Sequence, residues 1–253
     1  MLKTVARRLG KARLLGPPAA MSKVITLILL PGLDGTEIFF QPLLGALPES
    51  VRPVVVQYPR AGGNRYDELL AVIRRATSGI PEYYVLGWSF SGPLALMLAV
   101  AEPERVRGVI LSATFVRPPH AWLWWIRFAL VGPVVWSWRV LRRLPLWLFR
   151  SRADPERRAK TQTWRRIPAS LLARRLRTIA DVDARAALRT CRAPVLHLAA
   201  SHDAIVPRHN VDDILSECPS AQVVTIEGRH LAMYANPLPA AEAIVRFMAR
   251  TGR

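Results

Sequence analysis

Cysteine and long apolar runs are both scarce in this sequence of 253 residues. Its two cysteines, Cys191 and Cys218, are too few for a disulfide framework and lack metal-ligand spacing. No apolar run approaches the ~20 residues that cross a bilayer, because Arg127 and Arg139 interrupt the most apolar region. We therefore expect a reduced, cytoplasmic protein with no membrane span and no metal site.

Acidic residues are also few. The chain has 18 of them against 36 lysines and arginines, a formal net charge of +18, and none lies between Glu104 and Asp154. Such a surplus attracts acidic partners, which include anionic lipid, acidic proteins and nucleic acid, although a GC-rich genome would also enrich arginine. Because no nucleic-acid motif or phosphate-cradling glycine loop accompanies the charge, we expect no nucleic-acid partner.

Residues 1–22 differ in composition from the rest. The first 23 residues contain six basic residues and no acid, as amphipathic targeting segments do, but they lack the long apolar stretch of a secretory signal. We predict that residues 1–22 form a flexible basic leader. Since Met21 precedes the first predicted strand, a start-codon extension is the alternative.

From Lys23 onward, short β-rich runs alternate with helical patterns. Continuous apolar runs suit parallel strands that are buried on both faces, and their alternation with helices indicates one parallel sheet. The expected strands are 24–30, 51–58, 83–88, 106–113, 194–200 and 221–228, and the expected helices include 65–77, 91–102, 208–216 and 238–250. The predicted fold class is α/β, a mostly parallel sheet flanked by helices, with residues 23–116 and 186–253 as its core.

Residues 117–185 interrupt this alternation with helical periodicity, several prolines and no convincing strand. They hold seven of the eight tryptophans, and residues 117–180 carry fifteen basic residues against Asp154 and Glu156. We predict a helical lid inserted into the core. Tryptophans beside arginines suit a lid that rests on anionic lipid, whereas packing of the tryptophans against the core is the alternative.

The stretch YVLGWSFSGP places Ser89 between an apolar run and a helical pattern. Gly87 and Gly92 bracket it, so the chain can turn sharply and point the serine outward. A serine hydroxyl needs a histidine to take its proton and usually a carboxylate to orient that histidine. Ser89 is therefore the candidate nucleophile, with Ser91 as its rival.

His230 and Asp203 are the best-placed partners. His230 follows one predicted strand by two residues, and Asp203 lies just beyond the preceding strand, so both belong at the carboxyl edge of the sheet. Asp212 and Asp213, on a predicted helix, compete for the acid role. The other histidines are His120, His197, His202 and His209.

The loop LLPGLDGTEIF after the first predicted strand can supply donors for an oxyanion. Its glycines let the backbone bend so that the Leu33 amide is presented, and the Phe90 amide follows the nucleophile. One lost donor of this kind typically raises a barrier by about 3 to 4 kcal/mol. We expect Asp34 to cap the turn, because an acid facing the oxyanion would oppose it.

Together these motifs resemble those of α/β-hydrolase fold enzymes, from roughly residue 24 to 250. The elbow GWSFSG, the acid turn SHDAIVP, the histidine turn EGRHLAMYANP and the loop PGLDGT match in order and approximate spacing. The resemblance implies Ser89 as nucleophile, Asp203 as acid and His230 as base, with Leu33 and Phe90 as the oxyanion hole and no cofactor. A serine at the elbow also argues against dehalogenases and epoxide hydrolases, which use aspartate there.

Three residues depart from the family pattern without removing a catalytic group. Ser91 replaces the last elbow glycine, Pro31 the usual histidine before Gly32, and Arg229 a common glycine before His230.

GWS at the elbow with an arginine-bearing cap resembles the esterases that demethylate pimeloyl-acyl-carrier protein, whose cap binds an acidic carrier. This resemblance implies a small-molecule or carrier-bound ester, and an acidic carrier protein or an anionic membrane as partner, the latter with peripheral membrane attachment. The binding residues would be Trp88, Arg139, Arg142 and Arg143.

The expected function is hydrolysis of a carboxylic ester or thioester with an apolar acyl group through an acyl-enzyme. The alternatives are a non-catalytic binder of anionic surfaces that retains the fold, and the acyltransferase, lyase or peroxidase chemistry that the same fold hosts.

Overall fold

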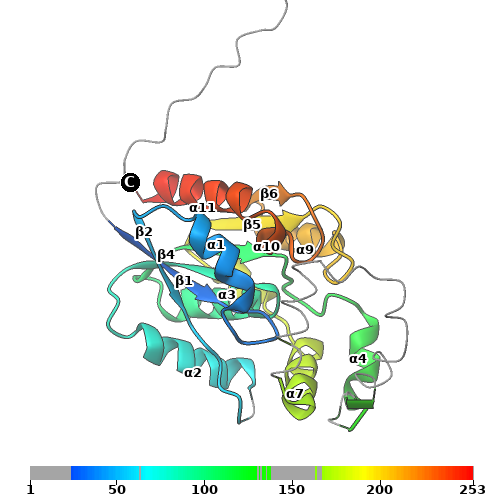
Figure 1. Ribbon diagram of the computed structural model, residues 1–253. Coiled ribbons are helices and arrows are strands. Elements are labelled where there is room, and N and C mark those ends of the chain that lie inside the picture. Colours follow the sequence, from blue (N-terminus) through cyan, green and yellow to red (C-terminus); the bar gives the residue numbers. More distant parts are fainter. Residues whose placement is uncertain are drawn as a thin grey trace, which may run out of the picture.

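A parallel sheet of six strands forms the centre of the molecule (Figure 1). The computed structural model describes residues 24–62, 64–129, 131, 133, 134, 136, 137, 163 and 167–252. The strand order is β2-β1-β3-β4-β5-β6, and every neighbouring pair is parallel. The strands are β1 (Ile25–Leu30), β2 (Val51–Val55), β3 (Tyr83–Trp88), β4 (Val106–Ser112), β5 (Val195–Ala200) and β6 (Gln222–Ile226). The predicted α/β class with a parallel sheet is confirmed, although β2 and β6 end before their predicted boundaries.

Helices cover both faces of this sheet. The four helices predicted by range are present as α2 (Tyr66–Thr77), α3 (Gly92–Ala101), α9 (His209–Glu217) and α11 (Pro237–Thr251). The short helices of the core are η1 (Ile38–Phe40), α1 (Gln41–Ala46), η2 (Ser89–Ser91), α8 (Arg185–Thr190) and α10 (Ala232–Ala235).

The core consists of two apolar layers, one on each side of the sheet. Ile28 and Leu30 of β1 pack with α2, α3, α8 and α9, whereas Leu27 and Leu29 pack with α1 and α11. All four side chains are fully buried. Since successive side chains of a strand point to opposite faces, a strand covered on both sides needs the continuous apolar run that the sequence has.

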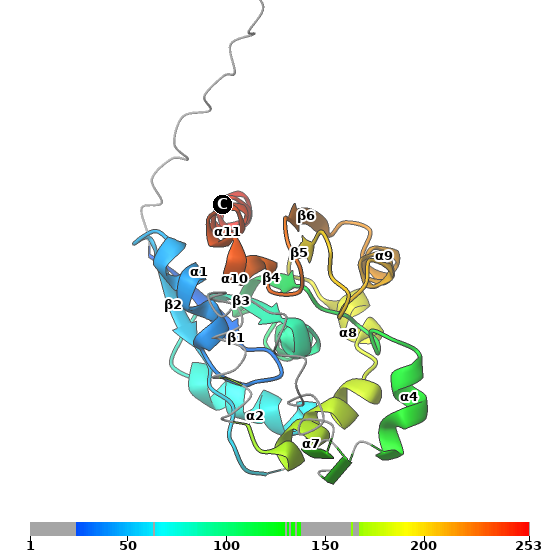
Figure 2. The same ribbon diagram turned by 45° about the vertical axis from the view of Figure 1, so that its right-hand side comes forward.

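An insertion lies between β4 and β5, where the lid is predicted (Figure 2). Its described elements are α4 (Trp122–Ile126), η3 (Arg127–Ala129) and α7 (Ala169–Ala180). The Ala184 amide donates to the Val116 carbonyl at 2.7 Å, which joins the two ends of the insertion beside the core. The predicted leader at residues 1–22 and the arginines at 139, 142 and 143 lie outside the described residues. No helix in the described part of the chain has the length and apolarity to cross a membrane.

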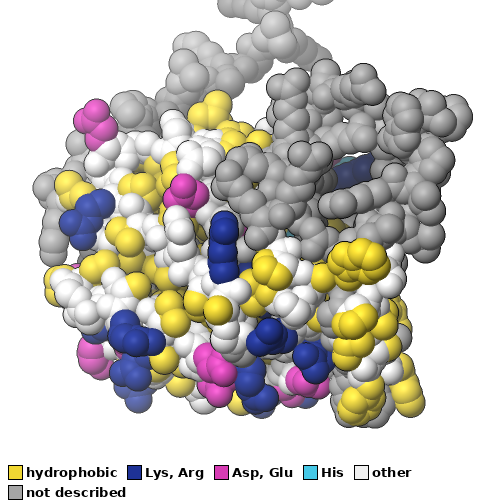
Figure 3. All heavy atoms as spheres, turned by 60° about the horizontal axis from the view of Figure 1, so that its bottom comes forward, with side chains coloured by type: hydrophobic (Ala, Val, Ile, Leu, Met, Phe, Trp, Pro, Cys, Tyr) yellow, Lys and Arg dark blue, Asp and Glu magenta, His cyan; other side chains and the backbone are white. Residues whose placement is uncertain are grey.

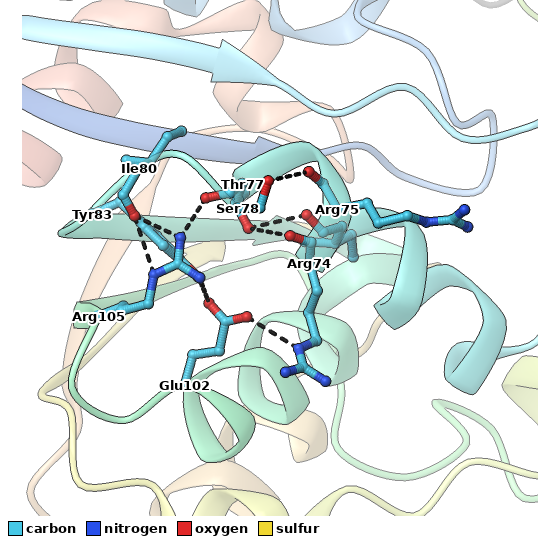
Figure 4. Close-up of polar contacts among 9 residues, drawn as sticks. Arg74, Arg75, Thr77, Ser78, Ile80, Tyr83, Glu102 and Arg105 are labelled. Atoms are coloured by element: carbon cyan, nitrogen blue, oxygen red, sulfur yellow. Dashed lines mark hydrogen bonds and ion pairs between the residues drawn. The ribbon is translucent and has the colours of Figure 1, made fainter.

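A polar cluster fixes the amino-terminal ends of β3 and β4 (Figure 4). The nearly buried Glu102 carboxylate accepts hydrogen bonds from Arg105 at 2.5 Å, from the Tyr83 hydroxyl at 2.7 Å and from Arg74 at 3.1 Å. Arg105 also donates to the Ile80 carbonyl. This cluster sits at the sheet edge opposite the loops that carry the candidate site, so its role is structural.

Candidate active site

Ser89 sits on a sharp turn between β3 and α3. Its φ of +51° is rare for a residue with a side chain, and such strain recurs at functional sites. A Cβ on Gly87 would lie 2.3 Å from the Ser91 carbonyl oxygen, so the turn requires glycine there. The Thr114 hydroxyl, from the loop after β4, donates to the Ser89 carbonyl and thereby stabilises the turn.

Ser89, His230 and Asp203 form a continuous hydrogen-bonded chain. Ser89 Oγ lies 2.9 Å from His230 Nε2, and His230 Nδ1 lies 2.7 Å from Asp203 Oδ2. The Ile205 and Val206 amides donate to Asp203 Oδ1 at 2.8 and 2.9 Å, which fixes the carboxylate. The structure thus brings together the three side chains that the sequence analysis selected, from the carboxyl ends of β3, β5 and β6. An imidazole held in this way can take a proton from the serine hydroxyl.

Trp88 supports the histidine of this chain from the core. Its ring is tilted by 34° against that of His230, with 5.8 Å between centroids, and it also packs against Phe39 at 5.2 Å. Only 5% of Trp88 is exposed. The sequence analysis placed Trp88 among the binding residues, and in the structure its ring contacts those of Phe39, Phe40 and His230.

The rival nucleophile, Ser91, points away from the histidine. It is fully buried, its hydroxyl donates to the Pro31 carbonyl, and the Tyr58 hydroxyl lies 2.6 Å from its Oγ. Ser91 therefore ties the elbow to the loop after β1, and no histidine is within hydrogen-bonding distance of it among the described residues.

The competing acids and histidines have other surroundings. Asp213 forms an ion pair with Arg117 at 2.6 Å, and Asp212 is exposed on α9. The remaining histidines contact the Ile205 carbonyl (His120), Glu227 (His202) and Asn210 (His209), while His197 is buried in β5.

The loop after β1 makes a tight turn beside Ser89. The Gly35 amide donates to the Gly32 carbonyl at 3.0 Å, and Gly35 has a φ of +70°. Asp34 caps the turn as expected, because its Oδ2 accepts the Thr36 amide at 3.0 Å. Burial raises the pKa of Asp34, against the opposing effect of the Thr36 hydrogen bonds. Within the described residues, the Leu33 amide makes no hydrogen bond, and neither does that of Phe90.

A cavity of about 220 Å³ lies between β5, β6 and α9, with Asp203 in its lining. Its polar lining includes His197, Thr114, Asp203 and Thr225. His197 is 1% exposed, and its Nδ1 has no hydrogen-bond partner in the part of the chain that the structure describes. Burial lowers the pKa of His197 to about 4, so the ring is neutral at neutral pH.

Sequence reasoning missed Arg175, the largest fully buried side chain in the part of the chain that the structure describes. It lies on α7 among Leu171, Leu172 and Ile179, which form the buried face of that helix. The available signal is an arginine at helical spacing with buried apolar residues, which the general surplus of arginine in this region conceals. Among the described residues, no group of three or more His, Cys, Asp or Glu is placed to hold a metal ion.

The fold and this site together define the class of protein. A parallel sheet with a serine on the turn after its third strand, and with a histidine and an aspartate on later loops of the same edge, is the arrangement of α/β-hydrolases. The protein is an α/β-hydrolase. The model of the family described as serine aminopeptidase, S33, matches residues 66–232, more than half of the chain, and the chain belongs to that family.

The individual relatives share only a minority of their residues with this chain, at 29% identity or less. The chain is 29% identical to the biotin biosynthesis bifunctional protein BioHC of Cellvibrio japonicus over 87% of its own length but only 47% of that longer protein. It is 28% identical to the pimeloyl-[acyl-carrier protein] methyl ester esterase of Nitrosomonas europaea over 71% of this chain and 77% of the relative. Among solved structures, a thermophilic esterase from Thermogutta terrifontis has a TM-score of 0.74 at 20% identity, with 90% of this chain and 91% of the esterase covered. That likeness concerns the fold.

Proposed function

We propose that the protein is a serine hydrolase that cleaves a carboxylic ester or thioester through an acyl-enzyme intermediate. The observation that carries this proposal is the chain of 2.9 and 2.7 Å contacts from Ser89 through His230 to Asp203. His230 takes the Ser89 proton as Oγ attacks the carbonyl carbon, and then gives that proton to the leaving group. Water, deprotonated by His230, attacks the acyl-enzyme, and the acid is released as the proton returns to Ser89.

The remaining roles follow from what surrounds this chain of contacts. Asp203 keeps the proton-bearing Nδ1 of His230 in place and stabilises the imidazolium that forms. The Leu33 and Phe90 amides bind the oxyanion of each tetrahedral intermediate. That neither amide has a partner among the described residues supports this assignment.

An ester with an apolar acyl group fits the surroundings of the oxyanion loop. The Leu33 side chain packs against the apolar cluster of Ile167, Leu171 and Leu172, so hydrocarbon lies next to the loop. The relative from Nitrosomonas europaea is named as a methyl ester esterase, which also supports ester chemistry.

Labelling with a fluorophosphonate probe tests the nucleophile. Wild-type protein should be labelled on Ser89, and Ser89→Ala should abolish labelling. Ser91→Ala, two residues away, is the matched control and should still be labelled. Labelling that survives Ser89→Ala contradicts the assignment, and an unreactive wild-type protein favours the non-catalytic binder. A panel of p-nitrophenyl esters and thioesters of increasing chain length then separates hydrolysis from other chemistries, since a labelled protein that releases no acid is not an esterase.

We also propose that the insertion recruits the enzyme to an anionic lipid surface. Large apolar side chains are exposed here, including Trp122 at 54% and Trp136 at 60% (Figure 3). Monomeric proteins rarely expose such clusters without a partner, and indole rings favour the membrane interface. No acidic residue occurs from position 105 to 153, so the arginines of this stretch give it a positive charge that complements anionic lipid.

Vesicle sedimentation tests this recruitment. Phosphatidylglycerol vesicles should bind the protein and phosphatidylcholine vesicles should not, and binding should weaken with salt because the screening length is ~8 Å at physiological ionic strength. Trp122→Ser with Trp136→Ser should weaken binding, whereas Leu238→Ser, an exposed leucine on α11, is the control and should not.

Replacing Arg139, Arg142 and Arg143 with glutamine tests the charge of the insertion. The triple variant should bind anionic vesicles more weakly and still hydrolyse p-nitrophenyl butyrate at nearly the wild-type rate, since that ester is neutral. Binding to acyl carrier protein in place of vesicles identifies the carrier as the partner. Binding to neither at low salt contradicts recruitment.

A further inference from the structure

Arg175 connects the insertion to the turn that carries the Leu33 amide. It comes from α7, is 1% exposed and donates to the Leu33 carbonyl at 2.8 Å across 142 residues of sequence. The same guanidinium packs against the turn at Gly35, where an added Cβ would lie 2.6 Å from Arg175 Nη1. One side chain thus contacts the turn at two of its four residues.

The far side of the guanidinium is held by the loop between β2 and α2, which lies beside α7 (Figure 2). Asn64 Oδ1 accepts from Arg175 Nε at 3.1 Å and from Nη2 at 2.8 Å, and the Pro59 carbonyl accepts from Nη2 at 3.3 Å. Asn64 adopts the left-handed conformation, with a φ of +59°, and its Nδ2 donates to the Ala61 carbonyl, so its Oδ1 is turned toward the arginine. The guanidinium fork is therefore bound on both sides.

Arg175 stays charged in this buried place. Burial lowers its pKa to about 10, and the nearby Asp34 opposes that effect. No carboxylate forms an ion pair with it among the described residues, so carbonyl oxygens and the face of Tyr58, 5.6 Å from the guanidinium carbon, stabilise the charge. Burying a cation among neutral acceptors costs free energy, whereas an apolar residue at this position would pack α7 without that cost.

We propose that Arg175 is a positioning residue for the oxyanion hole. It fixes the Gly32–Gly35 turn so that the Leu33 amide points at the reacting carbonyl, and these contacts of one α7 side chain thereby affect the rate of catalysis. This inference rests on the proposed function. It makes the insertion part of the reaction machinery in addition to any part it has in recruitment.

Arg175→Met tests this role, because methionine fills the space but donates nothing. Loss of one oxyanion donor lowers kcat by roughly 10²-fold to 10³-fold in other enzymes, so kcat/KM for p-nitrophenyl butyrate should fall by roughly a hundredfold. Arg175→Lys should lie between, since lysine keeps the charge without the planar fork. Arg174→Met is the matched control and should be near wild type, because Arg174 binds the Gly62 carbonyl and does not reach the turn.

Inhibitor binding separates positioning from mere stability. A trifluoromethyl ketone forms a tetrahedral adduct that needs the oxyanion hole, whereas the matching methyl ketone reports ground-state binding. In Arg175→Met the first should bind more weakly by about the factor lost in kcat/KM, and the second should be unchanged. Ile179→Ala, a core change in the same helix, should lower the melting temperature without altering this ratio.

Two results overturn the inference. One is a wild-type kcat/KM in Arg175→Met. The other is a parallel loss of affinity for both ketones, with a lowered melting temperature like that of Ile179→Ala. If Arg175→Met does not fold, the ratio of the two ketone affinities in Arg175→Lys decides in its place. Failure of the proposed function is distinct, because wild-type Ser89 would then not react with the fluorophosphonate.

Discussion

Two buried basic side chains, Arg175 and His197, lie on opposite flanks of the candidate site, and each is 1% exposed. Burial lowers both pKa values, to about 10 and about 4 respectively. Arg175 donates four hydrogen bonds and stays charged, whereas His197 has a nitrogen without a partner among the described residues and stays neutral.

The comparison teaches that equal burial has different consequences on the two flanks. The oxyanion flank is packed around a charge, so small changes there should affect catalysis. The flank at β5, β6 and α9 contains a cavity of about 220 Å³, so changes there should affect stability more than rate. Three predictions test this difference.

The largest effect is expected from Gly35→Ala. The new Cβ would meet Arg175 Nη1 at 2.6 Å, and alanine is strained at a φ of +70°, so the turn must shift. We expect kcat to fall roughly 10²-fold to 10³-fold, as when an oxyanion donor is lost. Gly62→Ala is the control, because Gly62 also has a positive φ, of +88°, but no atom lies within 4 Å of its added Cβ. Equal losses in the two variants would mean that backbone strain, and not contact with Arg175, sets the rate.

The fold could be predicted because the signals it depends on are local. The apolar runs of β1 and β3 and the periodicity of α2 and α11 reflect burial against their own neighbours, which one sequence records. The chemistry-bearing turns could be placed because they directly follow predicted strands, and the ends of parallel strands share one edge. The catalytic roles of Ser89, Asp203 and His230 remain predictions until the probe experiment is done.

Arg175 could not be assigned from the sequence for a physical reason. Its position beside Leu171, Leu172 and Ile179 signals burial, but two of its acceptors, at positions 33 and 59, are backbone carbonyls, which no side-chain pattern marks. The third acceptor, the side chain of Asn64, is 111 residues away in the sequence. The packing of Trp88 against Phe39 could not be assigned either, because it depends on how distant segments meet.

The second prediction concerns the pH dependence of folding. The pKa of His197 is about 4 in the folded protein, whereas a histidine in the unfolded chain has its usual pKa of 6.5. The unfolded chain therefore binds the proton more tightly. The stability contributed by the neutral ring is complete above pH 6.5 and is lost as the pH falls toward 4. The loss should reach about 3 kcal/mol of unfolding free energy. Urea titrations at pH 7 and pH 4 should show that His197→Val removes this part of the pH dependence. An unchanged difference between the two pH values would assign the loss to other groups.

The smallest effect is expected from filling the cavity next to His197. Ala199 lines it, so Ala199→Val adds two methyl groups to empty space and should raise the unfolding free energy by up to about 1 kcal/mol, without changing kcat. Ala95→Val is the control. Ala95 is fully buried in α3, and an added Cβ on Gly87 would already lie 2.9 Å from its Cβ, so the same change there should overpack the core and destabilise it by about 1 to 3 kcal/mol. Urea denaturation of both variants decides the matter. If Ala199→Val is as destabilising as Ala95→Val, the region around Ala199 has no more spare volume than the core, and the different charge states of Arg175 and His197 have another cause.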